Sequence, residues 1–374
     1  MTKVKRDMQF SILYFIGIIL IVANHVGGGG VSLMYNWFPA YSFHLGLFMF
    51  CSGYFFINNK NKSSKEIIKK KIKKLIIPLY GWNLVYGIII TILHQFGIKF
   101  GGDFTLENLL LLPIYDGHQF ILNLAAWYIP TLFLVEIINI PVLKFLNKKN
   151  DKFYYLYFIL SILIGFLGVH LAMEGYNKEW WLLLVRMLYF IPFFALGMLY
   201  KVKLQEKDTS KNTTYFSIVL ILTLITIYVF GGTKSYTPSW CSDFDNIYRP
   251  FITGFLGIAF WLRMSKVLIP ILKDSKLVSK ISNNTFAIMM HHITGFFLLN
   301  TFFAFLAKFT NLINNFDFNQ YVTTRKYLFL PKNLDQFEII YVVVGIAFSL
   351  LIVKLMRKIK NKLSKNPKLK FLFE

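Results

Sequence analysis

The sequence predicts an all-α protein: a polytopic membrane helical bundle with about ten transmembrane helices and both termini in the cytoplasm. Apolar runs of about 20 residues recur along the chain, and each is long enough to span a hydrocarbon core of ~30 Å. Only 16% of the 374 residues are charged and 56% are hydrophobic, whereas about a quarter of a soluble domain is charged. The mean hydropathy of +0.52 agrees with this class. The third observation is an alternation of lysine and arginine between successive connections.

Ten apolar segments are predicted to cross the membrane in turn, and the eighth is the shortest. They occupy residues 8–27, 38–58, 75–95, 121–143, 154–171, 182–200, 214–231, 249–263, 284–307 and 336–356. After the eighth segment, the stretch from Arg263 to Lys280 alternates apolar and lysine residues around Pro270. This stretch is predicted to be an interfacial amphipathic helix. Two roles stay open for it: gating of a substrate site at the cytoplasmic side, or an inert basic linker.

The net charge of +23 follows the predicted topology rather than a nucleic-acid partner. If the N-terminus is cytoplasmic, 32 of the 41 lysines and arginines fall in the cytoplasmic connections and the two termini, and the other 9 lie on the opposite side. Positively charged connections stay in the cytoplasm. The partner expected for this charge is the anionic headgroups of the lipid bilayer, and nucleic-acid binding is not expected.

Residues 1–374 are interpreted as a single integral-membrane domain without an internal repeat. The first segment lacks the small-residue pattern of a cleavage site, so it is expected to stay as a membrane anchor. Cys51 and Cys241 are expected at different depths, which argues against a disulfide between them. Metal-ligand spacing such as C-x-x-C is absent from the sequence, and neither a metal nor a bound cofactor is expected.

The strongest functional signal lies in the first two segments. Asn24 and His25 end the first apolar run, and His44 lies near the same end of the second. Ionisable side chains in segments that suit lipid are costly, so each is a candidate functional residue, although an imidazole at an interface can also be a simple anchor. Tyr14 precedes His25 by eleven residues, which places the two on one helix face ~16 Å apart. That face is predicted to connect a cytoplasmic donor site with an outer acceptor site.

Further polar residues interrupt the later segments. Each also has a purely structural interpretation: an aromatic belt for Trp127, a snorkelling stabiliser for Arg186, and a buried neutral acid for Glu136. Pro130 is expected to kink the helix that carries Trp127. One of His291 and His292 is expected to face away from any site, because neighbours on a helix are ~100° apart. The candidates for the site are Trp127, Tyr128, Glu136, Arg186, His291 and His292.

One outer loop is suited to a sugar. Residues 236–248 include Trp240, Asp243, Phe244 and Asp245, which would stack on a sugar ring and bond its hydroxyls. An ordinary polar loop with an interfacial tryptophan is the alternative interpretation.

Several of these stretches together resemble the acyltransferase-3 membrane acyltransferases, which O-acylate carbohydrates at the cell surface. The order of the stretches, the span count and the inside termini all resemble that family. The matching residues are 17–25 (GIILIVANH), 43–54 (FHLGLFMFCSGY), 127–130 (WYIP), 189–197 (YFIPFFALG) and 284–292 (NTFAIMMHH).

The resemblance implies a multi-pass protein of the cell membrane that uses a cytoplasmic acyl-CoA, usually acetyl-CoA, and a glycan hydroxyl as acceptor. It also implies that His25 is the catalytic residue. Many members have a basic residue at the position of Tyr14, so this chain departs from the family there. The positive charge for the phosphates of CoA is then expected from another group, among Lys3, Lys5, Arg6, Arg263 and His291.

The predicted reaction is transfer of an acyl group, with acetyl expected, to a glycan hydroxyl. His25 is expected to act as general base, because a neutral imidazole suits proton removal near pH 7. His44, Trp127 or Arg186 would donate hydrogen bonds to the oxyanion. Direct transfer is preferred to an acyl-enzyme, since neither Cys51 nor Ser52 has an evident base. The alternatives are a transporter or flippase of a lipid-linked or acyl intermediate, and a glycan polymerase.

Overall fold

The computed structural model describes residues 7–26, 32–33 and 36–363. Within those ranges, nine helical segments are long and apolar enough to cross a membrane, and α1 (Met8–Asn24) is a shorter apolar helix. These ten segments coincide with the ten predicted ones, which confirms the all-helical polytopic class. The nine longer segments are Ala40–Asn59, Ser64–Gln95, Leu124–Leu146, Lys152–Met173, Glu179–Leu204, Asn212–Val229, Arg249–Leu272, Thr285–Phe309 and Asp335–Lys362.

Several spans are built from helices that follow one another without a break. A π-helical turn (η2, Ile72–Ile76) joins α3 to α4, and another (η4, Tyr200–Leu204) extends α9. The long helices after α1 are α2 (Ala40–Phe56), α4 (Ile77–Gln95), α7 (Tyr128–Leu146), α8 (Lys152–Met173), α9 (Glu179–Leu199), α10 (Asn212–Val229), α11 (Arg249–Leu272), α13 (Thr285–Phe309) and α15 (Glu338–Leu363).

Short elements make the connections. The antiparallel pair of β1 (Ser32–Leu33) and β2 (Phe38–Pro39) connects α1 to α2. The short helices are α3 (Ser64–Lys71), α5 (Leu106–Leu110), α6 (Leu112–Tyr115), α12 (Lys276–Ser282), α14 (Phe318–Thr323) and the 3₁₀ turns η1 (Ile57–Asn59), η3 (Leu124–Trp127), η5 (Pro331–Asn333) and η6 (Asp335–Phe337).

Two predicted boundaries were wrong: the end of the eighth span and the extent of the interfacial helix after it. The eighth span does not end at residue 263 but continues as α11 to Leu272, because Pro270 lies in the last turn and the helix ends soon after it. The predicted interfacial helix is therefore divided between α11 and α12. Pro130 lies in the first turn of α7, directly after η3, where its missing N–H removes no bond inside the helix. The helix type changes from 3₁₀ to α just before Pro130, and the kink expected at this residue stays a prediction.

The centre of the bundle is formed by α2 and α9. Each of these spans contains an apolar stretch of 18 residues. The buried share of that stretch is 83% in the span of α9 and 72% in the span of α2, but only 17% in α10. A Cβ on Gly197 would lie 2.0 Å from the carbonyl oxygen of Phe50, and one on Gly53 would lie 2.0 Å from that of Phe194. Only glycine allows the two backbones to approach so closely, as at other helix crossings in membranes.

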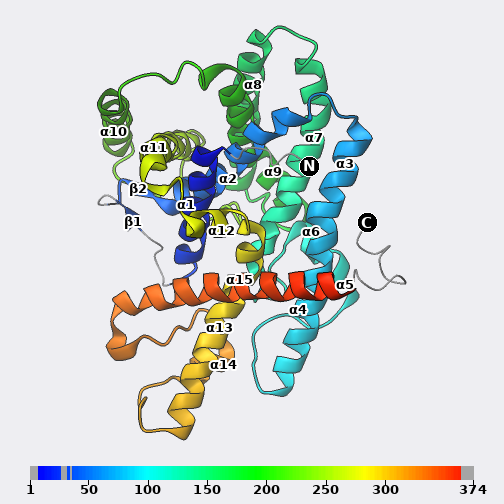
Figure 1. Ribbon diagram of the computed structural model, residues 1–374, viewed down its shortest axis with the longest axis vertical. Coiled ribbons are helices and arrows are strands. Elements are labelled where there is room, and N and C mark those ends of the chain that lie inside the picture. The colour runs from blue at the N-terminus through cyan, green and yellow to red at the C-terminus, as the bar shows by residue number, and fades with distance from the viewer. Residues whose placement is uncertain (1–6, 27–31, 34–35, 364–374) are drawn as a thin grey trace.

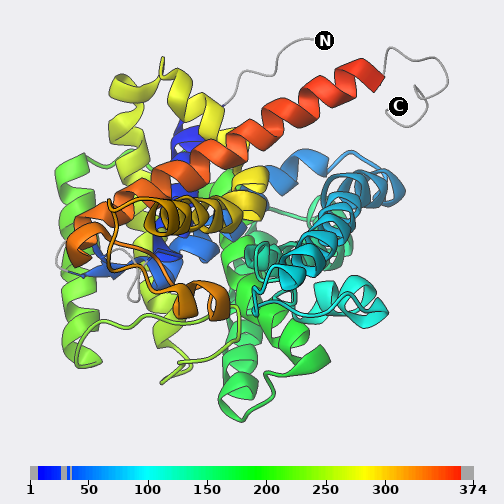
Figure 2. The ribbon, with the colours of Figure 1, turned by 90° about the horizontal axis from the view of Figure 1, so that it is seen from below.

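Around this centre, α1 packs against α2, α11, α12 and α13. Figure 1 shows α1 in the interior, with α10 and α11 on one side and α3 and α4 on the other. Helix α15 crosses α13 in the view of Figure 1 and lies against it in Figure 2, and the two helices are in contact. The C-terminal end of α1 is thereby enclosed by helices and by the connection between α14 and η5.

Candidate active site

One face of α1 carries the candidate site along its whole length. Asp7, the N-cap residue, accepts a hydrogen bond from the Phe10 N–H at 3.4 Å, and His25 is the C-cap residue. Residues on this face recur at intervals of three or four and line two cavities in succession. They are Asp7, Ser11, Tyr14, Ile18, Ile21 and His25. The predicted placement of Tyr14 and His25 on one face is therefore found in the structure.

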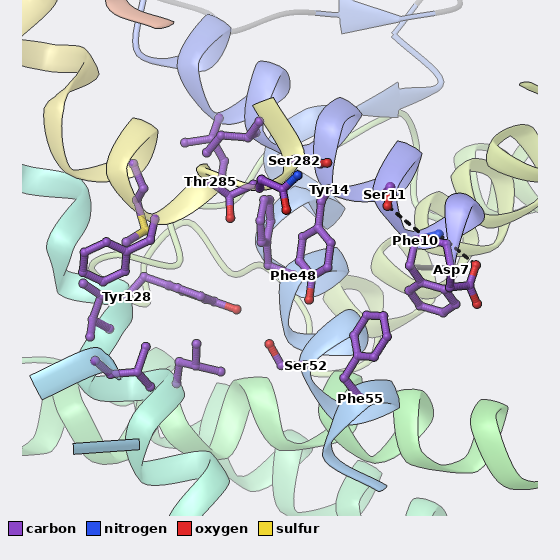
Figure 3. A pocket seen from close by; sticks show the side chains of 18 residues that line it. Asp7, Phe10, Ser11, Tyr14, Phe48, Ser52, Phe55, Tyr128, Ser282 and Thr285 are labelled. Carbon is purple, nitrogen blue, oxygen red and sulfur yellow. Dashed lines mark hydrogen bonds between the residues drawn. The ribbon is translucent and has the colours of Figure 1, made fainter. Parts of the chain in front are cut away.

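The first cavity, here called the Tyr14 cavity, has a volume of about 480 Å³. Apolar side chains form most of its wall, and Tyr14, Ser52 and Tyr128 point toward one another across it (Figure 3). The lining residues come from α1, α2, α7, η2 and the α12–α13 region. They are Asp7, Phe10, Ser11, Tyr14, Ile18, Ile21, Phe48, Ser52, Phe55, Leu75, Tyr128, Ile129, Leu132, Ser282, Asn283, Thr285, Phe286 and Met289.

The second cavity, here called the His25 cavity, is larger, at about 1060 Å³, and richer in polar groups. Helices α1 and α2 supply one wall, three connections supply most of the rest, and α7, α13, α14 and α15 contribute one residue each. Its polar and aromatic lining includes Asn24, His25, Tyr41, His44, His118, Trp127, Tyr128, Thr237, Trp240, Asp243, Arg325, Lys326 and Glu338. Ile21, Tyr128 and Met289 line both cavities, so the two spaces meet beside the last turn of α1.

His25 and His292 form a dyad at this meeting point. Nδ1 of His292 lies 2.8 Å from the Ile288 carbonyl, so it carries the hydrogen and Nε2 of His292 is an acceptor. Nδ1 of His25 lies 3.0 Å from that Nε2 and 2.8 Å from the carbonyl of Ile21. Both neighbours accept, which assigns the Nδ1–H tautomer to His25. The lone pair on Nε2 of His25 is therefore available as a base.

His44 is held in the same tautomer. Its Nδ1 lies 2.5 Å from the Ala40 carbonyl, so Nε2 is an acceptor while the ring is neutral. The Tyr41 ring packs edge-on against it, with the centroids 5.2 Å apart. The Tyr41 hydroxyl donates to the Asn24 carbonyl at 2.7 Å, which ties α2 to the end of α1. A neutral His44 thus offers an acceptor to the cavity, whereas an oxyanion needs a donor.

Arg186 of α9 is fully buried and lies outside the lining of both cavities. Its guanidinium donates to the carbonyls of Tyr115, Asp116 and Ser239, including Nε to Ser239 at 2.9 Å and Nη1 to Tyr115 at 3.0 Å. The central carbon of the guanidinium, Cζ, also lies 4.8 Å from the centre of the Trp127 ring. All five N–H groups are engaged, so Arg186 joins two connections and keeps no donor for a substrate.

The matching family model identifies the chemistry. A model described as an acyltransferase domain matches residues 11–356, which is nearly the whole chain. The chain belongs to the acyltransferase 3 family. Searches of curated proteins and of solved structures returned no significant match. Tyr14, the histidine dyad and both cavity walls all fall inside the matched range.

In this membrane acyltransferase, the two connections joined by Arg186 present an aromatic pair to the His25 cavity. His118 stacks on Trp240 with centroids 4.3 Å apart and planes 17° apart. Nδ1 of His118 donates to Asp116 at 2.7 Å. Burial lowers the pKa of His118 despite this carboxylate, so the ring is neutral near pH 7. Among the described residues, no group bonds its buried Nε2.

Two predicted site residues of the acyltransferase lie apart from the cavities. Glu136 is buried in α7 and pairs with Lys71 of α3. His291 points toward α4, where its Nδ1 lies 2.7 Å from the Tyr86 hydroxyl and its ring packs on Trp82. The structure therefore distinguishes the adjacent histidines, since His292 is the one that faces His25.

The expected sources of positive charge for the donor also have other contacts. Arg263 pairs with Asp208 and bonds the carbonyl of Ser210 at 3.0 Å, and His291 faces α4. Lys3, Lys5 and Arg6 lie outside the described residues.

Sequence reasoning missed three groups that line the His25 cavity: Tyr41, His118 and Arg325. Arg325 lies close enough to His25, His292 and Tyr41 to interact electrostatically with each. Arg325 and His118 belong to connections, where periodicity carries no information on direction. Arg325 follows two threonines and precedes Lys326 in a polar connection, so no signal in the sequence sets it apart.

Proposed function

We propose that this acyltransferase moves an acyl group, with acetyl as the expected group, from acyl-CoA to a hydroxyl of a cell-surface or secreted glycan. The observation that carries the proposal is the meeting of two unlike cavities beside His25, at Ile21, Tyr128 and Met289. A two-substrate transfer needs two binding spaces that share one reacting point. The Tyr14 cavity would hold the acyl end of the donor, and the His25 cavity the acceptor.

His25 acts as the general base in this proposal. Its Nε2 removes the proton from the acceptor hydroxyl while that oxygen attacks the thioester carbonyl. The C–S bond then breaks, and the leaving thiolate of CoA takes the proton back from His25. During the step the imidazolium keeps its Nδ1–H bond to Nε2 of His292, 3.0 Å away, which steadies its charge and its ring orientation.

The donor end follows from the shape and lining of the Tyr14 cavity. The apolar walls from Phe48, Phe55 and Leu132 suit the pantetheine chain and a small acyl group. Tyr14 and Tyr128 direct hydroxyls into this space near the junction, where a thioester carbonyl would lie. A phenol at Tyr14 can donate a hydrogen bond where many relatives would have a cation.

The acceptor end follows from the aromatic pair and its neighbours. A sugar ring stacks well on an exposed tryptophan, and Trp240 is 42% exposed at the wall of the His25 cavity. Nε2 of His118 and the carboxylate of Asp243 would accept hydrogen bonds from sugar hydroxyls. The excess of lysine and arginine on the other side of the bundle supports an outward-facing acceptor cavity in the cell membrane.

The test uses purified protein in lipid nanodiscs, with labelled acetyl-CoA and a panel of oligosaccharides. We expect the His25→Ala variant to lose acetyl transfer by about 10²-fold or more, because general-base catalysis contributes that much. His170→Gln is the matched control, since His170 is an exposed histidine outside both cavities. Wild-type transfer by His25→Ala would contradict the assignment. Movement of a lipid-linked substrate across vesicles without acylation would identify a transporter instead.

A further inference from the structure

Arg325 is half-buried and differs from the three buried arginines among the described residues. Arg186 is bonded to three carbonyls, Arg249 to Asp245 and the Gly232 carbonyl, and Arg263 to Asp208. Arg325 lies in the connection between α14 and η5 and lines the His25 cavity. Within the described ranges, no carboxylate pairs with its guanidinium and no carbonyl accepts from it.

The carboxylates of the same cavity do not neutralise this charge. Neither of the two carboxylates that line it, Asp243 and Glu338, forms an ion pair with Arg325 within the described ranges. Asp243 accepts instead from the hydroxyls of Thr237 at 2.5 Å and Ser242 at 3.1 Å, and the charge that acts on Glu338 is that of Asp335. The phenol of Tyr41 lies close enough to Arg325 to interact with it, but a phenol is neutral near pH 7 and supplies no counter-charge. Burial lowers the pKa of Arg325, yet a guanidinium stays charged at neutral pH. The cavity wall therefore holds a partly buried cation whose counter-charge the described protein does not supply.

An unpaired cation in such a place costs free energy unless a ligand supplies its partner. The planar guanidinium fork matches carboxylates and phosphates, which it binds through two parallel hydrogen bonds. The position of the charge is also relevant to the reaction. Arg325 lies within electrostatic range of His25, which must take up a proton in the proposed step. An anion bound to Arg325 would cancel the positive charge that opposes this uptake.

We propose that the acceptor is an acidic glycan whose carboxylate or phosphate group pairs with Arg325. This inference rests on the proposed function and names the substrate class of the same cavity. The ion pair with Arg325 fixes one end of the sugar unit, and the aromatic pair of His118 and Trp240 contacts the ring. The hydroxyl to be acylated is then held toward Nε2 of His25. A neutral glycan satisfies the stacking contact but leaves the guanidinium unpaired.

The experiment measures binding without a donor, so its result does not depend on acyl transfer. Wild-type protein in nanodiscs of neutral lipid is titrated with three probes of equal length: N-acetylglucosamine oligomers, oligogalacturonate and glycerol phosphate oligomers. We expect at least one acidic probe to bind about tenfold or more tightly than the neutral probe, as for other hydrogen bonds to charged groups. The two acidic probes separate a carboxylate partner from a phosphate partner.

Two variants locate the effect. Arg325→Gln is expected to remove the preference for the acidic probe while binding of the neutral probe changes little. Lys332→Gln removes the same charge from an exposed residue of η5 outside the cavity and is expected to keep the preference. A melting curve for each variant verifies that the bundle is intact.

Three results would overturn the inference: equal binding of acidic and neutral probes by the wild type, a preference that survives Arg325→Gln, or an equal loss in Lys332→Gln. A protein that prefers acidic probes but transfers no acetyl group would count against the proposed function and not against this site.

Discussion

The two cavities of this protein differ in size, in chemistry and in the segments that build them. The Tyr14 cavity, about 480 Å³, is lined mainly by apolar residues of the helical spans. The His25 cavity, about 1060 Å³, takes much of its wall from the connections around His118, Trp240 and Arg325. Rigid helices suit a donor whose structure is fixed, whereas connections on a rigid scaffold can vary with the acceptor. The difference supports the proposal that the bundle recognises the donor and the loops recognise the acceptor.

The histidines of the site show the same contrast between helices and connections on a smaller scale. His25 and His292 face each other across helices α1 and α13, and both Nδ1 atoms are anchored to carbonyls of their own helices. His118, in contrast, is oriented by Asp116 and by Trp240. Arg186 bonds the carbonyl of Asp116 and that of Ser239, the residue before Trp240. The proposed catalytic group is thus positioned by local helix geometry, and the proposed acceptor wall by a long-range clamp formed by Arg186.

The largest expected effect comes from breaking that clamp. Arg186→Met would leave three buried carbonyls without donors, and we expect the free energy of unfolding to fall by about 3 kcal/mol or more. The measurement is the thermal unfolding of purified protein. Arg357→Met is the control, because Arg357 is exposed and bonds only the Asn284 side chain among the described residues. An unchanged melting temperature for Arg186→Met would contradict the clamp.

The second prediction concerns the shared point of the two cavities. His292→Phe keeps a ring of similar size but removes the acceptor for the Nδ1–H of His25. We expect kcat for acyl transfer to fall by about 10²-fold, with little change in KM for either substrate. His291→Phe serves as the comparison, since His291 faces Tyr86, and should keep most of its kcat. Similar losses in the two variants would mean that ring packing, not the dyad, is what matters.

A third prediction separates the cavities directly. Leu132→Trp narrows the Tyr14 cavity and Leu330→Trp narrows the His25 cavity. Overfilling costs about 1–3 kcal/mol, so we expect KM to rise about tenfold for the donor in the first variant and for the acceptor in the second. Steady-state kinetics with each substrate varied in turn measures the effect. If both variants raise the same KM, the division into donor and acceptor cavities is wrong.

The smallest expected effect concerns the stacking contact. Trp240→Ala is expected to weaken acceptor binding about fivefold, because an aromatic stacking contact contributes about 1 kcal/mol. Trp240→Phe should retain most of the affinity, and Trp181→Ala, an exposed tryptophan outside the cavity, should retain all of it. Titration with the preferred oligosaccharide measures these differences. Equal binding by Trp240→Ala and the wild type would remove the acceptor from this wall.

The parts of the structure that the sequence predicted are those governed by local periodicity. Spanning segments show as apolar runs, since the bilayer requires each segment to satisfy its own backbone. The face shared by Tyr14 and His25 follows from 3.6 residues per turn. The end of α11 was predicted wrongly. The helix does not stop at residue 263, where the sequence becomes amphipathic, but continues through Pro270 in its last turn.

The site depended more on long-range contacts. Arg186 was a candidate for binding because it interrupts an apolar helix, but the carbonyls that engage it lie 53 to 71 residues away. Glu136 was a candidate for the same reason, and its partner Lys71 lies 65 residues away. Periodicity within one helix has no information on such partners. Arg325 was missed for the opposite reason, because an arginine in a polar connection is unremarkable until the fold encloses it.

The sequence by itself determined the membrane-bundle class, the ten apolar segments and the placement of Tyr14 and His25 on one helix face. These features depend on composition and on the geometry of a single helix. The tertiary structure decided that His292 and not His291 meets His25, that Arg186 is fully engaged, and that Arg325 is not. Those outcomes depend on which helices and connections pack together, because a polar side chain acts through the partner it meets and not through its position in the chain.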